Sequence, residues 1–183
     1  RPLEFIRNGP ILHQLMIRIV GVGGGFDYGT AGFTHHSLED VGILRALNGI
    51  RIYSPADSRQ LRTIMKTTSF MEGPIYYRLN KENTGDISEL AGRFELDQVQ
   101  EIKSGGDIAF FSSGSIAREA LAAANELEKN HKIKCAVFVV SSLHSNSNKN
   151  MKEVLVNRRS AITIETHNIH GGLGSLVAEV IAD

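Results

Sequence analysis

Two adjacent histidines, His35 and His36, are the residues of this sequence best placed to do chemistry. An imidazole titrates near neutral pH and can both donate and accept hydrogen bonds, so it can act on hydroxyl and carbonyl groups of a ligand. Both histidines follow a glycine-rich segment, residues 21–25, which itself follows a β-branched apolar run over 17–20. Ligands of parallel sheets bind outside the carboxyl ends of the strands. The pattern therefore predicts a ligand site presented after the first strand.

The residues after the histidines have the composition of a helix start. Ser37 is a good N-cap, and Asp40 stands in the capping-box position three residues later. Apolar spacing over 38–47 predicts an amphipathic helix. The positive end of its dipole would disfavour an imidazolium ion, so we expect a neutral histidine that donates or accepts a hydrogen bond. For His36, simple packing or capping is an equally good explanation.

The glycine run and one arginine allow two interpretations each. The run suggests a dinucleotide fingerprint, but its third glycine would fall at Phe26 and no helix follows directly. A loop that needs positive φ or close backbone approach explains the glycines better. Arg78 stands near the carboxyl end of the strand predicted over 75–79, where a guanidinium suits phosphate or carboxylate binding. An ordinary surface salt bridge is the alternative for Arg78.

Other constellations are weak. His167 and His170 flank a loop near Glu165, but there is no cysteine partner or further carboxylate at ligand spacing. Loop hydrogen bonding therefore explains them better than metal ligation. The serine-rich turn at residues 112–115 does not supply the Gly-x-Ser-x-Gly elbow of a serine hydrolase.

Strand and helix patterns alternate along the chain, which is typical of parallel sheets with helices on both faces. We expect an α/β fold of two parallel-sheet units, over 1–85 and 106–183, joined by a polar linker over 86–105 with a short strand or hairpin near 94–102. A helix near 3–6 is predicted to break at Asn8, Gly9 and Pro10. Further strands are predicted over 50–53, 108–111, 133–140 and 161–165. Residues 54–57 predict a helix start, with Ser54 as the cap and Pro55 at the first helical position, and this helix continues over 58–66. Further helices are predicted over 116–129, 148–156 and 176–181.

Composition excludes several classes of partner. The 20 basic and 20 acidic residues give a formal net charge of zero, which offers no electrostatic support for nucleic-acid or acidic-membrane binding. There is no bilayer-length apolar stretch and no visible signal peptide, so a cytoplasmic location is expected. Cys135 lies in an apolar run and is expected to be a buried thiol in a reducing compartment. Because the chain begins at Arg1, we expect a fragment or the ordered part of something longer.

A series of motifs resembles the transketolase family. The first half contains GFTHHSLED from Gly32, LRALN from Leu44 and SPAD from Ser54, and it resembles the family's pyrimidine-binding domain. The second half resembles the family's C-terminal domain, with GDI, SGS, IETH and GGLGS in residues 106–108, 113–115, 164–167 and 171–175. The motifs cover nearly the whole chain in one order.

The resemblance implies a thiamine-diphosphate- and Mg²⁺-dependent transferase of carbohydrate metabolism. Such an enzyme, expected as a dimer, passes a two-carbon ketol unit from a ketose phosphate to an aldose phosphate. It implies that His35 is catalytic and faces the substrate hydroxyls, that His36 also contacts substrate, and that Arg78 grips the sugar phosphate. The C-terminal domain is implied to bind no cofactor and to serve dimer contacts.

The chain departs from the family pattern in several places. Ala31 stands where transketolases often have an acidic residue, and a family histidine is replaced within residues 23–25, which bears on sugar specificity. The activating glutamate, the aromatic pyrimidine pocket and the Gly-Asp-Gly…Asn segment that binds magnesium and diphosphate are not in these residues. We therefore expect the 183 residues alone to be inactive, as part of a larger polypeptide or of a split enzyme whose partner subunit binds the diphosphate.

Three alternatives remain open at this point. A deoxyxylulose-phosphate synthase fits Thr34, His35 and Arg78 tolerably, and a 2-oxo acid dehydrogenase beta-type subunit fits them poorly. A non-catalytic assembly partner or degenerate homologue is favoured by Ala31 and by the altered loop at 23–25. A plain nucleotide-binding α/β domain is disfavoured by the broken glycine fingerprint.

Overall fold

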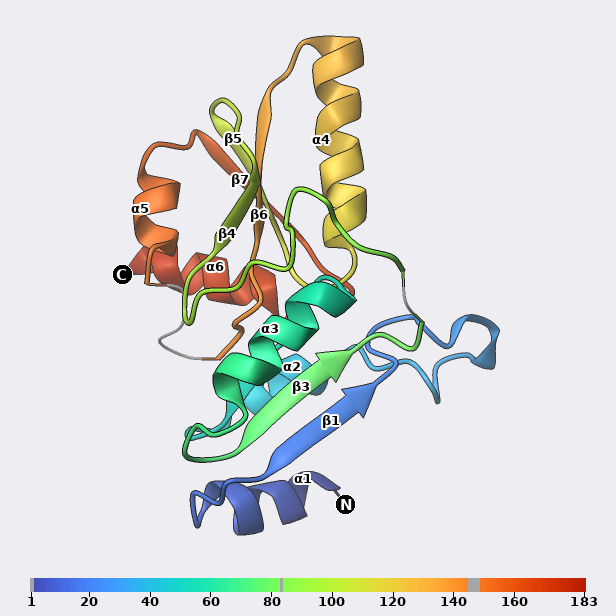
Figure 1. Cartoon of the computed structure of the whole chain (residues 1–183), viewed down its shortest axis with the longest axis vertical. Helices are drawn as coiled ribbons and strands as arrows, with labels where there is room; N and C mark the ends of the chain where they lie inside the picture. Colours follow the sequence, from blue (N-terminus) through green and yellow to red (C-terminus); the bar gives the residue numbers. More distant parts are fainter. Residues whose placement is uncertain (1, 83, 145–148) are drawn as a thin grey trace.

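The computed structural model describes residues 2–82, 84–144 and 149–183, which form two α/β units (Figure 1). The strands are β1 (Arg18–Val22), β2 (Arg51–Tyr53), β3 (Ile75–Leu79), β4 (Gln100–Lys103), β5 (Ile108–Ser112), β6 (Cys135–Val139) and β7 (Ser160–Ile164). The helical elements are α1 (Pro2–Ile6), α2 (Asp40–Arg45), α3 (Ser58–Thr68), α4 (Ala117–His131), α5 (Met151–Val156) and α6 (Leu173–Ala182), with a π-helical segment η1 (Arg7–Ile11) and a 3-10 turn η2 (Gly29–Ala31). The α/β fold predicted from the alternation of strands and helices is confirmed.

The first sheet is fully parallel, whereas the second contains one antiparallel edge strand. The first sheet has the order β1-β3-β2 and is parallel throughout. The second has the order β4-β6-β5-β7, in which β5, β6 and β7 are parallel and the edge strand β4 runs antiparallel to β6. Strand β4 falls within the predicted linker over 86–105, so this stretch contributes a strand to the second sheet rather than a hairpin. The predicted unit boundaries stay a prediction.

In the first unit, the side chains of the central strand β3 alternate between two helices. Ile75 and Tyr77 pack in one buried cluster with Ile64 of α3, and Tyr76 packs in another with Leu44 of α2. This alternation follows from the two-residue period of a strand. Figure 1 shows α3 in front of the sheet and α2 behind it. The two helices therefore hold the carboxyl end of β3 in a fixed place.

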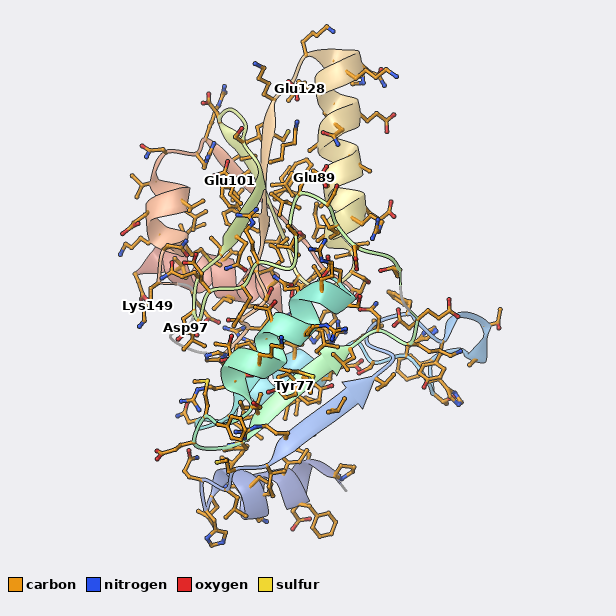
Figure 2. All side chains as sticks on the ribbon, viewed as in Figure 1. Tyr77, Glu89, Asp97, Glu101, Glu128 and Lys149 are labelled. Atoms are coloured by element: carbon orange, nitrogen blue, oxygen red, sulfur yellow. The ribbon has the colours of Figure 1, made fainter. Side chains whose placement is uncertain are left out.

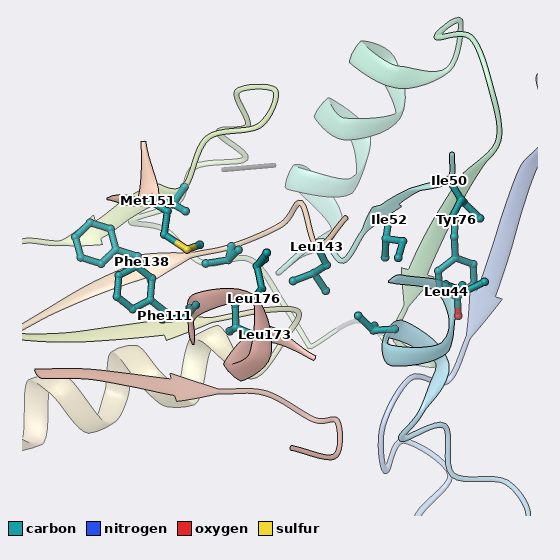
Figure 3. Close-up of a cluster of buried hydrophobic side chains, with 14 of the residues drawn as sticks. Leu44, Ile50, Ile52, Tyr76, Phe111, Phe138, Leu143, Met151, Leu173 and Leu176 are labelled. Carbon is teal, nitrogen blue, oxygen red and sulfur yellow. The ribbon is translucent and has the colours of Figure 1, made fainter. Parts of the chain in front are cut away.

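The second unit is built in the same way around β5 and β6. Phe111 and Phe138 face α5 and α6, with their rings stacked 5.2 Å apart, and both lie in the cluster drawn in Figure 3. Phe110 and Val137 face the opposite side, where α4 packs through small side chains such as Ala120. Small residues on a helix allow its backbone to approach the sheet closely.

Strand β2 lies at the edge of the first sheet, and its outer side is hydrogen-bonded to the second unit. The N–H of Ser54 donates to the carbonyl of Ser141 at 2.8 Å, and the N–H of Leu143 donates to Ile52 at 2.9 Å. The N–H of Ile52 in turn donates to Nδ1 of His144 at 3.2 Å. Figure 3 shows Leu143 between the buried side chains of the two units, which share one continuous core cluster. The two units are therefore joined through both backbone pairing and apolar burial.

The same histidine also contacts an aspartate next to this junction. Nδ1 of His144 lies 3.2 Å from the Ile52 nitrogen and 3.4 Å from the Ile52 carbonyl oxygen, and its Nε2 lies 3.3 Å from Oδ1 of Asp97. The hydrogen bond from His144 holds the pKa of the Asp97 carboxyl below its usual range, although burial acts in the opposite direction. The Asp97 carbonyl also accepts the N–H of Lys149 at 2.8 Å, and Figure 2 shows the two residues side by side.

We expect Asp97→Asn to lower the free energy of unfolding by about 0.5–1 kcal/mol at neutral pH, a small value because the carboxylate is partly exposed. Since its folded pKa is lowered, this contribution is present above the unfolded pKa of about 4 and is lost as the pH falls through the folded value. Urea unfolding of both proteins at about pH 7 and about pH 3 measures the change. Asp107→Asn, at an exposed aspartate, is the control. A difference of equal size at both pH values would contradict the assignment.

The helix break predicted near the N-terminus is wrong, and the helix predicted over 148–156 is only partly described. Asn8, Gly9 and Pro10 do not break the helix, because η1 continues through them as a wider π turn. Proline has no N–H to donate, and the wide turn is closed by other bonds, such as that from the N–H of Leu12 to the carbonyl of Arg7 at 3.1 Å. The helix predicted over 148–156 is α5, and its first predicted residue lies outside the described residues.

Two expectations from composition concern the cysteine and membrane spans. Cys135 is buried at the start of β6, as predicted. Burial raises the pKa of its thiol because the thiolate would lose hydration, so this group is a weak nucleophile. Over the described ranges of the chain, no helix is both long and apolar enough to cross a bilayer.

Candidate functional site

The two histidines lie on a loop that projects from the carboxyl edge of the first sheet, between β1 and α2 (Figure 1). An antiparallel bridge closes the base of this loop. The N–H of Gly25 donates to the Ser37 carbonyl at 2.8 Å, and the N–H of Ser37 donates to the Gly25 carbonyl at 3.0 Å. We call the enclosed residues 26–36 the site lobe. Its base is fixed by backbone hydrogen bonds, so its position does not depend on a helix.

The glycines before the site lobe are required by close packing. Gly25 has φ of +70°, and a Cβ there would lie 2.6 Å from Cβ of Thr166. A Cβ on Gly24 would lie 2.8 Å from Cζ of Arg78. These contacts confirm that the glycine run serves positive φ and close backbone approach, and the segment passes directly over the Arg78 guanidinium.

His35 is exposed on the site lobe and stands in a row with an aromatic ring and a cation. Its ring centroid lies 5.8 Å from that of Tyr28, and its Nδ1 lies 3.0 Å from Oγ1 of Thr34. The Nζ atom of Lys81 stands 5.0 Å from the centroid of the same Tyr28 ring. Within residues 2–82, 84–144 and 149–183, no carboxylate forms an ion pair with Lys81. The ammonium group is therefore available to an anion that enters beside His35.

An aspartate links the site lobe to the end of β3. Oδ2 of Asp27 accepts the backbone N–H of Lys81 at 2.8 Å, and Oδ1 accepts the side-chain amide of Asn80 at 3.4 Å. The same amide donates to Oγ of Ser115 at 2.6 Å, at the start of the second unit's α4 region. These bonds join three segments that are far apart in sequence.

His36 is turned toward its own loop. Its Nε2 lies 2.9 Å from the carbonyl of Gly29, so this nitrogen donates the hydrogen bond, and its ring meets Phe26 edge-on at 5.1 Å. Phe26 is 58% exposed and Phe33 is 81% exposed. The lobe therefore presents His35 together with two exposed aromatic side chains.

Arg78 lies beneath the lobe, and its guanidinium is occupied. Nε is 2.9 Å from Oδ2 of Asp40, and one terminal nitrogen donates to the carbonyls of Ser37 and Thr166 at 3.0 and 2.9 Å. Arg78 is only 6% exposed. The Tyr76 hydroxyl also donates to Asp40 at 2.9 Å, and burial, reinforced by the Asp40 carboxylate, raises the pKa of Tyr76 so that it stays protonated. Arg78 thus connects the base of the lobe to the second unit.

The helix start predicted after the histidines is wrong in position. Helix α2 begins at Asp40, its N-cap residue Glu39 makes no side-chain capping bond, and Ser37 does not cap it. The reason is tertiary: Ser37 is bridged to the glycine loop, and the Asp40 carboxylate binds Arg78 and Tyr76. The histidines do not adjoin a helix end, so the argument from its dipole does not apply to them.

Loop hydrogen bonding of His167 is confirmed. Its Nε2 accepts the N–H of Gly42 at 3.2 Å, and its Nδ1 lies 2.9 Å from the carbonyl of Asn168. The nearby Glu165 caps α6, since its carboxylate accepts the N–H groups of Leu173 and Gly174 at 2.7 and 2.9 Å. In the part of the chain that the structure describes, no three His, Cys, Asp or Glu side chains are grouped to hold a metal ion.

The structure therefore brings His35 and His36 together in one lobe and sets Arg78 below it. The sequence interpretation missed Tyr28, Lys81 and Asp27. One signal was available for Lys81, because it follows the predicted strand 75–79 at the edge where ligands bind. A hollow of about 200 Å³ adjoins Lys81. It is lined by Pro55, Ala56, Asp57, Ser58, Leu61, Leu79, Asn80, Lys81, Glu82, Thr84 and Ser115.

Comparison with known families gives matches to both halves of the chain. Residues 1–86 match the family model described as the transketolase pyrimidine-binding domain. Residues 97–183 match the model described as the transketolase C-terminal domain. The two matches follow one another in the order found in the sequence motifs.

Individual relatives agree with these matches. The chain is 32% identical to one subunit of the apulose-4-phosphate transketolase of Actinobacillus succinogenes, over 100% of this chain and 58% of that protein. It is 31% identical to a 6-deoxy-6-sulfo-D-fructose transketolase subunit of a Clostridium species, over 92% of this chain and 52% of that protein. A solved structure described as a split-gene transketolase, inactive beta4 tetramer, superposes with a TM-score of 0.86 at 30% identity, over 98% of this chain and 57% of that chain. The chain thus spans between half and three fifths of the length of these relatives.

Proposed function

This chain belongs to the transketolase family, and from that premise we propose that it forms the substrate-facing part of a thiamine-diphosphate-dependent transketolase. The complete enzyme transfers a two-carbon ketol unit from a ketose phosphate to an aldose phosphate. The observation that carries the proposal is the row of His35, Tyr28 and Lys81 at the carboxyl edge of the first sheet. This edge is where α/β proteins bind ligands.

In this proposal His35 is the catalytic residue of the chain. Its imidazole is exposed on a lobe whose base is fixed, so it can donate to or accept from substrate hydroxyls without competing for an internal partner other than Thr34. Lys81 binds the anionic substituent of the sugar, because its ammonium has no ion pair within the described residues. The names of the two transketolase relatives contain a phosphate and a sulfo group, which is consistent with an anion site.

The other two predicted site residues have supporting positions. His36 is proposed as a second substrate contact through its remaining ring nitrogen, while its Nε2 holds the lobe closed. The phosphate role of Arg78 stays a prediction. Its guanidinium would have to release Asp40, Ser37 or Thr166 to reach a sugar phosphate, whereas Lys81 would not.

The cofactor site is proposed to be only partly formed by the residues of this chain. Among the described residues, no three His, Cys, Asp or Glu side chains are grouped to hold a metal ion. We therefore propose that most ligands of thiamine diphosphate and Mg²⁺ lie outside these 183 residues, in the same polypeptide or in a partner subunit, and derive no step through them. The unit over 1–85 is proposed as part of the pyrimidine-binding domain, and that over 106–183, after a linker, as the C-terminal domain.

A separate partner subunit is favoured by the relatives. Two of them are named as subunits, and the split-gene structure is described as an inactive tetramer of one chain type. We propose that this chain assembles with a diphosphate-binding subunit in a dimeric unit. The exposed Phe26 and Phe33 on the site lobe suit burial against such a subunit.

The test is reconstitution of the natural protein that contains these residues. We expect the protein without its diphosphate-binding subunit to be inactive with thiamine diphosphate and Mg²⁺, and the mixture to convert ketose and aldose phosphates. A panel of ketose phosphates and 2-oxo acids as donors separates transketolase activity from that of a deoxyxylulose-phosphate synthase or an oxo acid dehydrogenase. A correctly assembled mixture that is inactive on the whole panel would instead favour an assembly role.

A further inference from the structure

We infer that Asp27 is a positioning residue that sets Lys81 beside Tyr28 and His35, and so determines how tightly the site holds the anionic group of its substrate. The inference rests on the proposed function, since it concerns the same site. It adds a residue from the site lobe that the family motifs in this sequence do not include. The tested ligand class is a phosphate-bearing sugar, with inorganic phosphate as the minimal probe.

Asp27 holds Lys81 through the backbone. Strand β3 ends at Leu79, so the backbone N–H of Lys81 is beyond the ladder of the sheet. Oδ2 of Asp27 accepts this N–H at 2.8 Å, and Oδ1 receives the Asn80 amide at 3.4 Å. Both oxygens of one carboxylate therefore fix two consecutive residues at the end of β3.

Asp27 does not neutralise the lysine that it holds. The carboxylate binds the backbone of Lys81, and the two side chains form no ion pair. The ammonium instead stands over the Tyr28 ring at 5.0 Å, a weak contact that an incoming anion can replace or extend. Residues 27 and 28 thus act together: one fixes the lysine backbone and the next guides its side chain.

The conformational entropy of the lysine stem connects this anchoring to affinity. A lysine side chain has several rotatable bonds, and immobilising it on a ligand costs about 0.7–1.4 kcal/mol, which is about three- to tenfold in affinity. Anchoring its backbone and restricting its stem over an aromatic ring reduces that cost. Loss of Asp27 should therefore weaken phosphate binding by about three- to tenfold while Lys81 itself is still present.

Tyr28 provides a probe of this arrangement. It is the only tyrosine of the four in these residues that is not buried, since Tyr53, Tyr76 and Tyr77 are at most 8% exposed. In the natural full-length protein labelled with ¹³C-tyrosine, the Tyr28 resonance is assigned by its loss in Tyr28→Phe. Titration with inorganic phosphate then reports both the position of Lys81 over the ring and the phosphate affinity.

We expect phosphate to shift the Tyr28 resonance in the wild type and not in Lys81→Ala. Asp27→Ala should move the resonance of the free protein toward that of Lys81→Ala and weaken phosphate binding about three- to tenfold. Asp27→Asn keeps one acceptor oxygen, so its Tyr28 resonance and its phosphate affinity should lie between those of the wild type and those of Asp27→Ala. The double variant Asp27→Ala with Lys81→Ala should bind phosphate no more weakly than Lys81→Ala alone, because both changes act on one contact. Asp107→Ala, at an exposed aspartate in the second unit, is the control and should change nothing.

Two outcomes overturn the inference. One is that both Asp27 variants have the same Tyr28 chemical shift and the same phosphate affinity as the wild type. The other is a Lys81→Ala protein that binds phosphate as the wild type does, and this result counts even if Asp27→Ala fails to fold. A merely structural Asp27 would lower the melting temperature without changing phosphate affinity in the folded protein.

Turnover separates this inference from the proposed function. In an active reconstituted enzyme, Asp27→Ala should raise KM for a phosphorylated acceptor about three- to tenfold and leave kcat and the KM of the unphosphorylated analogue nearly unchanged. If the wild-type enzyme has no transketolase activity, the proposed function fails, while the phosphate titration still decides the role of Asp27. A KM increase of equal size for both acceptors would overturn the positioning role.

Discussion

His35→Ala is expected to lower kcat of the complete enzyme by about a hundredfold or more. The imidazole stands on the exposed side of the site lobe, 5.8 Å from the Tyr28 ring, where a substrate bound through Lys81 would meet it. Removing a group that moves a proton or polarises a hydroxyl in the transition state typically costs two to four powers of ten in rate. Steady-state kinetics with a ketose phosphate donor measure the loss.

The variant should leave the structure intact, because His35 is exposed and its side chain contacts Thr34 and Tyr28 of the same lobe. His131→Ala, at an exposed histidine at the end of α4, is the matched control and should keep wild-type kcat. His35→Gln retains hydrogen bonding without proton exchange near neutral pH, so it separates the two uses of the ring. A reconstituted His35→Ala enzyme with nearly wild-type turnover would favour the non-catalytic assembly partner.

Arg78→Met is expected to lower the free energy of unfolding by about 3–5 kcal/mol. The guanidinium is buried and pairs with Asp40, so its removal leaves a carboxylate at the base of the lobe without its main partner. It also leaves the carbonyls of Ser37 and Thr166 without their donor. Urea unfolding measures the change, and Arg59→Met, which removes an exposed pair with 4.0 Å between its charged atoms, should cost less than about 1 kcal/mol.

The double variant Arg78→Met with Asp40→Asn tests the pairing itself. It should recover part of the loss, since neutralising the partner removes the unpaired buried charge. If Arg78 instead serves mainly as a sugar-phosphate ligand, Arg78→Met would leave stability nearly unchanged and raise KM for phosphorylated substrates. These two results distinguish the connecting role seen in the structure from the role that the sequence predicts.

The fold could be predicted because its strands are short apolar runs separated by helical patterns. The core explains why: Phe110 and Phe111 face opposite sides of the second sheet, and each side is covered by helices. Such burial on both faces requires a continuous apolar strand, which is visible in sequence. The antiparallel β4 was less visible, since only alternate residues of it, such as Ile102, are buried.

Local capping signals were less reliable than these patterns. Ser37 and Asp40 have the spacing of a capping box, but both are taken by partners distant in sequence, Gly25 and Arg78. The cap of α3 is similarly displaced, because Asp57 accepts the N–H of Gln60 at 2.7 Å, whereas the sequence placed the helix start at Ser54. A capping residue satisfies whichever donors lie nearest in the folded chain, and sequence spacing alone does not identify them.

The candidate site was predicted in part for the same reason. His35 and His36 are adjacent in sequence and follow a strand, so their location at a ligand-binding edge could be inferred. Lys81, Asp27 and Tyr28 meet only because β1 and β3 are neighbours in the sheet. Because these strands are adjacent, the loops that follow them lie side by side. No sequence motif in either loop predicts this contact.

The most direct test of the central claim follows the carbon atoms. The complete enzyme, reconstituted with thiamine diphosphate and Mg²⁺, is given a ketose phosphate labelled with ¹³C at carbons 1 and 2 and an unlabelled aldose phosphate. We predict that both labels appear together at carbons 1 and 2 of the new ketose phosphate, and that the shortened aldose phosphate is unlabelled. No label transfer in an assembled enzyme, or a product formed only from a 2-oxo acid with release of carbon dioxide, would contradict transketolase activity for this chain.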